Sequence, residues 1–295
     1  MKISVLMGGS SAEREVSIKT GRAVIRACEE LGHKAIPVDF YDDYQSTLAM
    51  LKGADLVFNA LHGTTGEDGT IQLWLEDNNI PFTGSGSNSS KLCMNKDKSK
   101  KTVRDNNFLT PDWFLFDREN DSRQVDFPCI VKPNAQGSTF GLSMIENKEG
   151  IKDAITLAFK YDSDALIEKY IKGREITVGI LDGRALPIVE IIPKNSLYDY
   201  ECKYSPGMSK YLCPAKLDKG LEHNIKKDSL DIFNILKCRG YGRLDFILDD
   251  DGNYYFLEIN TLPGMTSTSL LPIAAKEQGL MFEELIDAII RVSIY

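Results

Sequence analysis

The sequence predicts a mixed α/β fold in which a parallel α/β lobe is followed by α+β lobes, and three observations lead to this prediction. The chain has 295 residues, enough for two or three domains or lobes at ~100–200 residues each. Near the N-terminus, strand-like and helix-like runs alternate, which is typical of right-handed βαβ units on a parallel sheet. Further along, this alternation gives way to shorter runs and one hairpin.

The N-terminal lobe is expected to span residues 1–91. Hydrophobic periodicity and helix-ending glycines predict its elements. In order, these are KISVLM as a strand, a helix from Glu13 to Leu31, KAIPV as a strand, a helix ending near Gly53, DLVFNAL as a buried strand and TIQLWLED as a helix. The stretch GSGSNSSK, residues 84–91, is rich in glycine and serine. It is therefore interpreted as the linker that ends the lobe.

A central lobe is expected over residues 92–175 and a C-terminal lobe over residues 176–295. The central lobe should contain a helix in NKDKSKKTVRDN, the strand FPCIVKP, a helix from Lys148 to Tyr161 and the strand ALIEKYI. The C-terminal lobe should contain ITVGIL, ALPIVEII, the long polar loop YDYECKYSPGMSKY, a helix near residues 220–238, a hairpin and a final helix. In that last helix the apolar residues recur at helical spacing, which favours core packing over a partner interface; they are Phe282, Leu285, Ile286, Ile289 and Ile290.

Composition excludes several classes of function. The net charge is −8 and the chain has no dense block of lysine and arginine, so a nucleic acid is not an expected partner. No apolar run approaches the ~18–20 residues that span a bilayer, and we expect a cytoplasmic protein without a membrane partner. The six cysteines form no CxxC pair and the three histidines stand far apart, so zinc and disulfide sites are weakly supported.

The stretch GRLDFILDDDGNYYFLEIN, residues 242–260, predicts a hairpin with an unusual charge distribution. Two alternating apolar runs flank Asp251 and Gly252, and an Asp-Gly pair is a strong turn signal. A two-residue turn there places Asp245 opposite Glu258, with both side chains on one face. Because like charges directly opposite destabilise a sheet, a missing positive charge is expected at this face.

Magnesium is the cation that best suits this face. Asn260 and Arg243 form the neighbouring pair of the same register, and no lysine stands nearby in the sequence. The oxygen atoms of Asp245, Glu258 and Asn260 therefore suit Mg²⁺. The alternative is a solvated outer face with an ion pair to Arg243. An EF-hand loop is nearly excluded, because its first ligand position would fall on Ile247, inside a strand.

Mg²⁺ held by few protein oxygens usually shares a phosphate-bearing ligand, and the sequence offers a candidate cradle for one. In IVKPNAQGSTFGLS, residues 130–143, a strand and Lys132 precede a loop of small residues, whose N–H groups can approach an anion. The loop lacks the Gly-Lys-Ser/Thr ending of a P-loop. Lys96 and Lys203 could add positive charge. A plain hairpin turn and three surface lysines are the alternative.

Two further loops follow strands of the N-terminal lobe, where parallel sheets commonly receive ligands. They are GGSSAEREVS and ALHGTTGEDG. Glu13, in the first loop, could hold an ammonium group or could simply favour the dipole of the helix that begins there. His62, in the second loop, could bind a ligand or could be a structural histidine at a strand end.

Together and in this order, these stretches resemble the D-alanine:D-alanine ligases of the ATP-grasp superfamily over essentially the whole chain. The matching motifs are GGSSAEREVS, ALHGTTGEDGTIQ, PFTGSG, IVKPNAQGS, LIEKYIKGREITV, YDYECKY, GYGRLDF and LEINTLPGMTSTSL. The resemblance implies an ATP-grasp fold with a Rossmann-like N-terminal lobe and ATP held between the other two lobes. It also implies a role in peptidoglycan precursor synthesis, and a homodimer is plausible from the family only.

The resemblance implies a role for each matching residue at the nucleotide. Adenine would meet Glu168, Lys169 and Ile171, and the ribose would meet Glu175. Phosphates would be bound by Lys96, Lys132 and Lys203, beneath a loop around Ser138. Mg²⁺, with Mn²⁺ as the alternative, would be bound by Asp245, Glu258 and Asn260.

The implied reaction joins two D-alanines through an acyl phosphate made with ATP. Arg243 and the N–H of Gly264 would stabilise the oxyanion of the joining step. The substrates would be bound by Glu13, at the first ammonium, by Ser269 and the N–H of Leu270, at the second carboxylate, and by His62. Glu13, Ser138 and Tyr204 would form a hydrogen-bonded set that excludes water.

Three other functions stay open at this point. A depsipeptide ligase would join D-alanine to D-lactate, although the pair Lys203 and Tyr204 resembles the dipeptide-forming branch. Another ATP-grasp ligase would join different acids and amines. A non-catalytic nucleotide sensor would have no reason to retain Glu13, Tyr204, Arg243 and Ser269.

Overall fold

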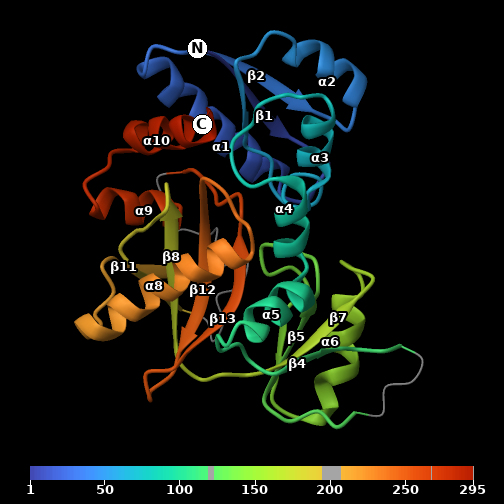
Figure 1. Ribbon diagram of the computed structural model, residues 1–295. Coiled ribbons are helices and arrows are strands. Elements are labelled where there is room, and N and C mark those ends of the chain that lie inside the picture. The colour runs from blue at the N-terminus through green and yellow to red at the C-terminus, as the bar shows by residue number, and fades with distance from the viewer. Residues whose placement is uncertain (119–122, 195–206, 267, 295) are drawn as a thin grey trace.

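A computed structural model describes the chain except residues 119–122, 195–206, 267 and 295 (Figure 1). Its strands form a parallel three-stranded sheet, a four-stranded sheet and a six-stranded sheet within these residues. The expected α/β architecture is therefore present. Among the described residues, no helix combines the length and the apolar character that crossing a bilayer requires. The lobe boundaries after residues 91 and 175 stay predictions.

The three-stranded sheet is made by the first part of the chain. Its elements follow the predicted order: β1 (Lys2–Gly8), α1 (Arg14–Glu30), β2 (Lys34–Phe40), α2 (Tyr44–Leu51), β3 (Leu56–Asn59) and α3 (Thr70–Asp77). The strand order is β2-β1-β3 and both pairings are parallel. The carboxyl ends of β1 and β3 therefore open on the same edge, where the loops with Glu13 and His62 begin.

The expected linker at residues 84–91 is wrong in its second half. Helix α4 (Ser87–Met94) begins there and is followed by α5 (Lys96–Asp105). Ser89 and Ser90 are buried, and the Ser89 hydroxyl donates a hydrogen bond of 2.9 Å to the carbonyl of Leu236. The small side chains thus serve close packing, a role that composition alone does not distinguish from flexibility. In Figure 1, α4 leads from the N-terminal sheet to α5.

The four-stranded sheet is antiparallel, in the order β4-β7-β5-β6. Its elements are β4 (Trp113–Leu115), β5 (Cys129–Pro133), β6 (Ser143–Ile145), the 3-10 helix η1 (Lys148–Gly150), α6 (Ile151–Ala158) and β7 (Ala165–Lys169). Ala154 and Ala158 of α6 pack with Val131 and Ile167 of the sheet. Sequence periodicity predicted β5, the helix and β7, but the three-residue strands β4 and β6 are too short for a period to show.

The six-stranded sheet has the order β11-β10-β8-β12-β13, with β9 beside β8. The strands are β8 (Arg174–Leu181), β9 (Arg184–Ala185), β10 (Val189–Pro193), β11 (Ser209–Leu212), β12 (Tyr241–Leu248) and β13 (Tyr254–Asn260), and the helices are α8 (Lys219–Ile235), α9 (Leu270–Glu277) and α10 (Phe282–Ile294). Ile225, Ile232 and Phe233 of α8 join the same apolar cluster as Leu244 and Phe246 of β12.

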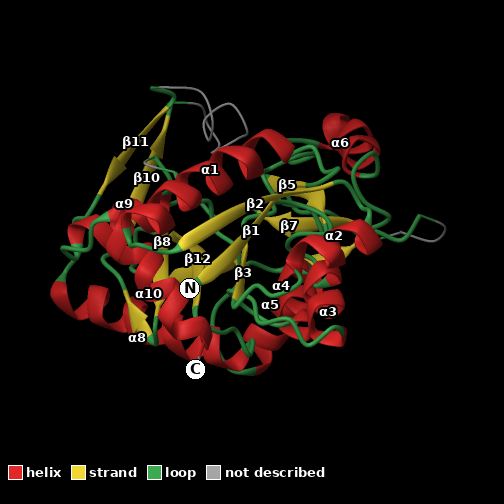
Figure 2. Cartoon of the chain, turned by 90° about the horizontal axis from the view of Figure 1, so that it is seen from above, coloured by secondary structure: helices red, strands yellow, loops and turns green. Residues whose placement is uncertain are grey.

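Helix α10 ties the C-terminus to the N-terminal sheet. Its residues Leu285, Ile286, Ile289 and Ile290 are at most 1% exposed and share a cluster with Ile3 of β1. Figures 1 and 2 show α10 beside α1. The prediction that this apolar face packs in the core is confirmed.

The hairpin of β12 and β13 has the predicted pairs but a different turn. Asp245 pairs with Glu258, and Arg243 pairs with Asn260. However, Leu248 pairs with Tyr254 and not with Tyr255, and the Asp249 N–H donates to the carbonyl of Asn253. Residues 250–252 therefore form a loop one residue longer than the two-residue turn predicted at Asp251 and Gly252. A bulge after Asp245 shifts the register back by one residue. The two departures cancel, which is why the opposed carboxylates were predicted correctly.

Candidate active site

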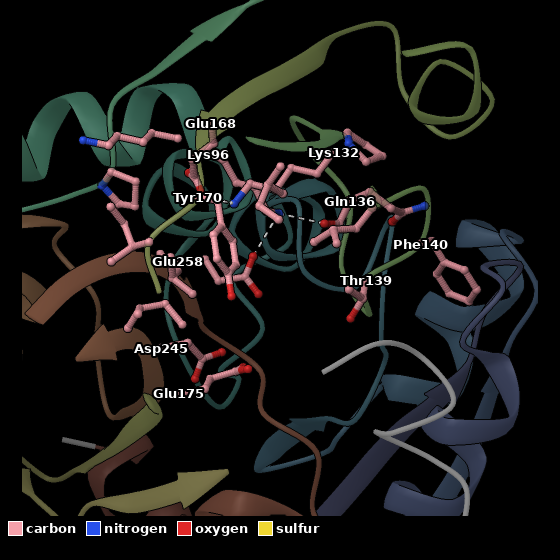
Figure 3. Close-up of a pocket in the computed structure, with 18 residues that line it drawn as sticks. Lys96, Lys132, Gln136, Thr139, Phe140, Glu168, Tyr170, Glu175, Asp245 and Glu258 are labelled. Carbon is pink, nitrogen blue, oxygen red and sulfur yellow. Dashed lines mark hydrogen bonds and ion pairs between the residues drawn. The ribbon is translucent and has the colours of Figure 1, made fainter. Parts of the chain in front are cut away.

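Two adjoining cavities contain every predicted site residue that the structure describes. The first, of about 130 Å³, lies between the four-stranded sheet and the hairpin (Figure 3). It is lined by the predicted residues Lys96, Lys132, Glu168, Lys169, Ile171, Glu175, Asp245 and Glu258. Lys203 lies outside the described residues. These positions agree with a nucleotide site, although the individual roles stay predictions.

The second cavity, of about 320 Å³, lies between the loops of the N-terminal lobe and the other end of the hairpin. It is lined by the predicted residues Glu13, His62, Ser138, Arg243, Asn260, Gly264, Ser269 and Leu270. Lys96 and Glu258 line both cavities. A phosphate in the first and a carboxylate in the second could therefore meet at these two side chains. Tyr204 lies outside the described residues.

The acidic face of the hairpin is neutralised by protein cations. Arg243 donates two hydrogen bonds, of 2.9 and 2.8 Å, to the two carboxylate oxygens of Asp245. The Thr177 hydroxyl donates a third, of 2.6 Å, to Asp245 Oδ1. Lys96 Nζ lies 3.0 Å from Glu258 Oε2. The expectation that no lysine compensates these carboxylates is wrong for Glu258, because Lys96 reaches it from α5, which is distant in the sequence.

The alternative of a solvated hairpin face is right about its ion pair, which joins Arg243 and Asp245, but wrong about solvation. Asp245 is only 6% exposed, and the Glu258 side chain is 28% exposed. Among residues 1–294 outside the gaps, no group of three or more histidine, cysteine, aspartate or glutamate side chains could hold a metal. The candidate set has two carboxylates and one amide, and the amide oxygen of Asn260 accepts a 2.8 Å hydrogen bond from the Leu262 N–H. This set fits Mg²⁺ only if a bound ligand supplies further oxygens.

A buried charge cluster forms the floor of the first cavity. Glu168 is 3% exposed, and its two oxygens lie 2.5 Å from Lys100 Nζ and 3.0 Å from Lys132 Nζ. Burial acts to raise the pKa of Glu168, but the two ammonium groups outweigh it and leave the pKa below its ordinary value. Burial lowers the pKa of Lys100 to about 8, against the opposing effect of Glu168. The cluster therefore holds Glu168 as a carboxylate.

Sequence reasoning missed Lys100, although a signal was present. Lys100 is fully buried, and Lys96, Ser99 and Val103 are the other buried residues of α5. They recur at helical spacing, so the buried face of this very polar helix carries two lysines. A lysine is almost never fully buried unless it is paired, which makes such spacing an indicator of a buried acidic partner.

Lys96 is fixed from several directions. Its Nζ donates a 2.7 Å hydrogen bond to the carbonyl of Gln136, and Figure 3 shows this bond together with the contact to Glu258. Its backbone N–H donates to the carbonyl of Asn134, at 3.0 Å. The Asn95 side chain caps α5 by accepting from the Lys98 N–H, at 2.9 Å. The helix start therefore positions Lys96 against the loop after β5.

That loop also reaches the N-terminal lobe. The hydroxyl of Ser138 donates a hydrogen bond to a carboxylate oxygen of Glu13. Ser138 and Thr139 have positive φ values of 50° and 62°, a conformation that is uncommon for residues other than glycine and that clusters at functional sites. Two members of the predicted hydrogen-bonded set are thus in contact across the second cavity.

His62 has partners on both ring nitrogens. Nδ1 lies 3.2 Å from Glu67 Oε1, and Nε2 lies 3.2 Å from the hydroxyl of Thr20. The residue is 5% exposed. His62 is therefore fixed by its neighbours, as the structural interpretation expected, and it also lines the second cavity.

The loop before α9 closes the far end of the second cavity. The Ser269 hydroxyl accepts a 3.0 Å hydrogen bond from the Thr266 N–H, and α9 begins at the next residue, Leu270. A Cβ atom on Gly264 would lie 3.1 Å from Ser269 Oγ, so only glycine fits there without displacing Ser269. Gly264, Ser269 and Leu270, the first residue of α9, line the same cavity.

Comparison with known proteins agrees with this arrangement. The family model described as "D-ala D-ala ligase C-terminus" matches residues 104–291, and "D-ala D-ala ligase N-terminus" matches residues 42–85. A D-alanine–D-alanine ligase of Aquifex aeolicus (strain VF5) is 45% identical over 293 residues, which cover 98% of this chain and 100% of that protein. The corresponding ligase of Geobacter sulfurreducens (strain ATCC 51573 / DSM 12127 / PCA) is 43% identical, with 98% and 93% covered.

Solved structures show the same relationship. The Bacillus anthracis D-alanine–D-alanine ligase in complex with ATP superposes with a TM-score of 0.86 at 36% identity, covering 100% of this chain and 97% of that one. The VanG D-Ala:D-Ser ligase of Enterococcus faecalis superposes with a TM-score of 0.85 at 29% identity, covering 99% of each. The chain therefore belongs to the D-alanine–D-alanine ligase family and has its ATP-grasp fold.

Proposed function

We propose that this protein uses ATP to join two D-alanine molecules into D-alanyl-D-alanine through an acyl phosphate. One observation carries the proposal: the cavity lined by the phosphate-binding candidates and the cavity lined by the substrate-binding candidates share Lys96 and Glu258. This is the arrangement that transfer of a phosphoryl group to a bound carboxylate requires. A sensor that only bound nucleotide would have no use for the second cavity.

In the first step, the carboxylate of one D-alanine attacks the terminal phosphate of ATP, and ADP leaves. A free carboxylate is a poor electrophile, and phosphorylation gives it a good leaving group. Lys96 and Lys132, which line the first cavity, would bind the phosphates. Asp245, Glu258 and Asn260 would hold Mg²⁺ or Mn²⁺, which when bound neutralises phosphate charge. The Ser138 loop then excludes water, which would otherwise hydrolyse the acyl phosphate.

In the second step, the amine of another D-alanine attacks the carbonyl carbon of the acyl phosphate; a C–N bond forms, the bond to the phosphate oxygen breaks, and phosphate leaves. Arg243 and Gly264 line the same cavity. The Arg243 guanidinium and the Gly264 N–H would donate to the developing oxyanion, and the loss of one such donor typically costs ~3–4 kcal/mol. Glu13 would bind the ammonium of the first D-alanine. Ser269 and the N–H of Leu270 would bind the carboxylate of the second, at the start of α9.

A product assay tests this proposal. Purified protein is incubated with ATP, Mg²⁺ and D-alanine, and the products are identified by mass. We expect D-alanyl-D-alanine, ADP and phosphate. D-lactate, D-serine and L-alanine are offered in parallel as second substrates. Faster ATP consumption with D-lactate would favour the depsipeptide ligase. Faster ATP consumption with D-serine would favour a D-alanine:D-serine ligase, the activity in the name of the VanG protein. ATP binding without turnover on any of them would favour the sensor.

Two further features are proposed from the reaction and the family. Because the reaction consumes ATP, we place the protein in the cytoplasm. We also propose a homodimer. Light scattering on the purified protein tests the dimer, and a mass of one chain at micromolar concentration would contradict it.

A further inference from the structure

Two cysteines that are far apart in the sequence have their thiols in contact beside the second cavity. Cys93 belongs to α4, and Cys238 lies between α8 and β12. Their sulfur atoms are 3.5 Å apart. The described cysteines are all free thiols. Among them, Cys93 and Cys238 are the pair whose sulfur atoms are in contact. Spacing in the sequence could not reveal it, because the two residues are separated by 145 positions.

The surroundings make one thiol of the pair more acidic than the other. The Ser89 hydroxyl shares its one proton between the carbonyl of Leu236, at 2.9 Å, and Cys238 Sγ, at 3.3 Å. The hydrogen bond from Cys93 lowers the pKa of Cys238 most, burial opposes it, and Ser89 and Ser85 lower the pKa further. The same contact with Cys238 and burial raise the pKa of Cys93. The thiolate is the reactive form of cysteine, so Cys238 is the better nucleophile.

One thiol of the pair lines the second cavity, and the other is partly exposed. Cys93 is 3% exposed, yet it lines the second cavity with Glu13 and Arg243. Cys238 is half-buried. By contrast, Cys28 is completely buried in an apolar core, and burial raises its pKa to about 11. The pair therefore combines access, acidity and a neighbouring thiol, the three features of a redox-sensing cysteine pair.

We propose that Cys93 and Cys238 are a reversible oxidation site, at which a peroxide forms a disulfide that lowers ligase turnover. The Cys238 thiolate attacks one peroxide oxygen; an S–O bond forms, the O–O bond breaks and hydroxide leaves. The Cys93 thiol then attacks this sulfenic acid; an S–S bond forms, the S–O bond breaks and water leaves. Two thiols are thus oxidised by two electrons and one peroxide is reduced to two waters. A thiol reductant reverses the change.

The disulfide would act on turnover through the chain segments that it joins. Cys93 precedes Lys96 by three residues, and Cys238 precedes Arg243 by five. A disulfide bond, at about 2.05 Å, is much shorter than the present contact between the sulfur atoms. Forming it therefore draws α4 and the segment before β12 closer to each other. A displacement of ~1 Å in a catalytic group can cost up to ~10²-fold in rate. We therefore expect a large loss of turnover, with the fold retained.

The experiment uses the full chain, hydrogen peroxide and two readouts. Reduced protein is exposed to peroxide, remaining thiols are alkylated, and the protein is digested without reductant. We expect a Cys93–Cys238 linked peptide by mass spectrometry and a loss of turnover of at least about tenfold, both reversed by a phosphine reductant. Failure to find the linked peptide, or a bridge from either thiol to Cys202 instead, would overturn the proposal. The mass readout does not depend on the proposed function.

Variants separate the disulfide from general oxidative damage. Cys238→Ser, and Cys238→Ala as a second replacement, should keep turnover when reduced and should resist peroxide. The matched control is Cys213→Ser, which removes a half-buried thiol outside this pair and should leave both the bridge and the peroxide sensitivity intact. Thermal melting checks that each variant is folded. Equal peroxide inactivation of wild type and folded Cys238→Ser would contradict a switch at this site.

Discussion

Replacing Arg243 with alanine tests the charge arrangement of the hairpin most completely. The substitution removes the cation that contacts both oxygens of Asp245, at 2.9 and 2.8 Å. At 2.8 Å and an effective dielectric constant of about 20, the gross attraction is roughly 6 kcal/mol. Desolvation of both ions offsets part of this, and removing one partner of a buried pair typically costs about 3–5 kcal/mol.

We expect the lower end of that range for Arg243→Ala. Asp245 keeps the hydrogen bond from Thr177, and the side chains of Arg243 and Asp245 retain 14% and 9% exposure. A loss of about 3 kcal/mol should lower the melting temperature by roughly 5–10 °C. Because a divalent cation can replace the missing positive charge, Mg²⁺ with an ATP analogue should stabilise the variant more than the wild type.

Turnover gives the second readout of Arg243→Ala. Loss of an oxyanion donor should lower kcat by roughly 10²–10³-fold while ATP still binds. The matched control is Arg174→Ala. Arg174 makes a similar two-bond pair with Glu190 on the same sheet, at 2.9 and 2.6 Å, outside both cavities. This control should lose some stability and keep turnover. Unchanged turnover in Arg243→Ala would refute the oxyanion role, and unchanged melting would refute the charge argument.

Three further predictions concern single residues. Glu258→Gln should raise the Mg²⁺ concentration needed for half-maximal turnover by at least about tenfold; a titration that overlays the wild type would count against Glu258 as a ligand. Ser138→Ala removes the hydrogen bond to Glu13 and should raise KM for D-alanine by about tenfold; an unchanged KM would show that this contact is not used. Burial lowers the pKa of Lys100 to about 8, so Lys100 loses its proton at a lower pH in the folded than in the unfolded protein. Stability should therefore rise between pH 8 and 9.5, by about 2 kcal/mol relative to Lys100→Met; parallel urea-unfolding profiles would contradict this.

The elements that sequence reasoning predicted well are those whose pattern repeats several times. Helices α1 and α10 have enough residues for hydrophobic periodicity to be clear, and the N-terminal strands were found as short apolar runs alternating with helices. The short strands β4 and β6 have three residues each and give no period. The helix at Ser87–Met94 was missed because its serines are there for close packing, and serine-rich composition indicates a linker equally well.

The candidate site shows a similar division. Residues that stand in motifs, such as Glu13 and Arg243, could be named from the sequence. The spacing of the buried residues in α5 could have indicated Lys100, but its partner Glu168, like the partner in the thiol pair, lies more than 60 positions away and could not be named. Such partners are brought together by tertiary packing, which local sequence does not encode. The predicted register of the hairpin was right only because a bulge compensates for a longer turn.

Manganese binding, followed by electron paramagnetic resonance, tests most directly whether Asp245 and Glu258 face each other in order to hold cations that arrive with ATP. Without nucleotide, Arg243 and Lys96 occupy these carboxylates, so weak binding is expected. With a non-hydrolysable ATP analogue, we predict tight Mn²⁺ binding that falls at least about tenfold in Asp245→Asn. Equal Mn²⁺ affinity in the wild type and this variant, with the analogue bound to both, would contradict the account.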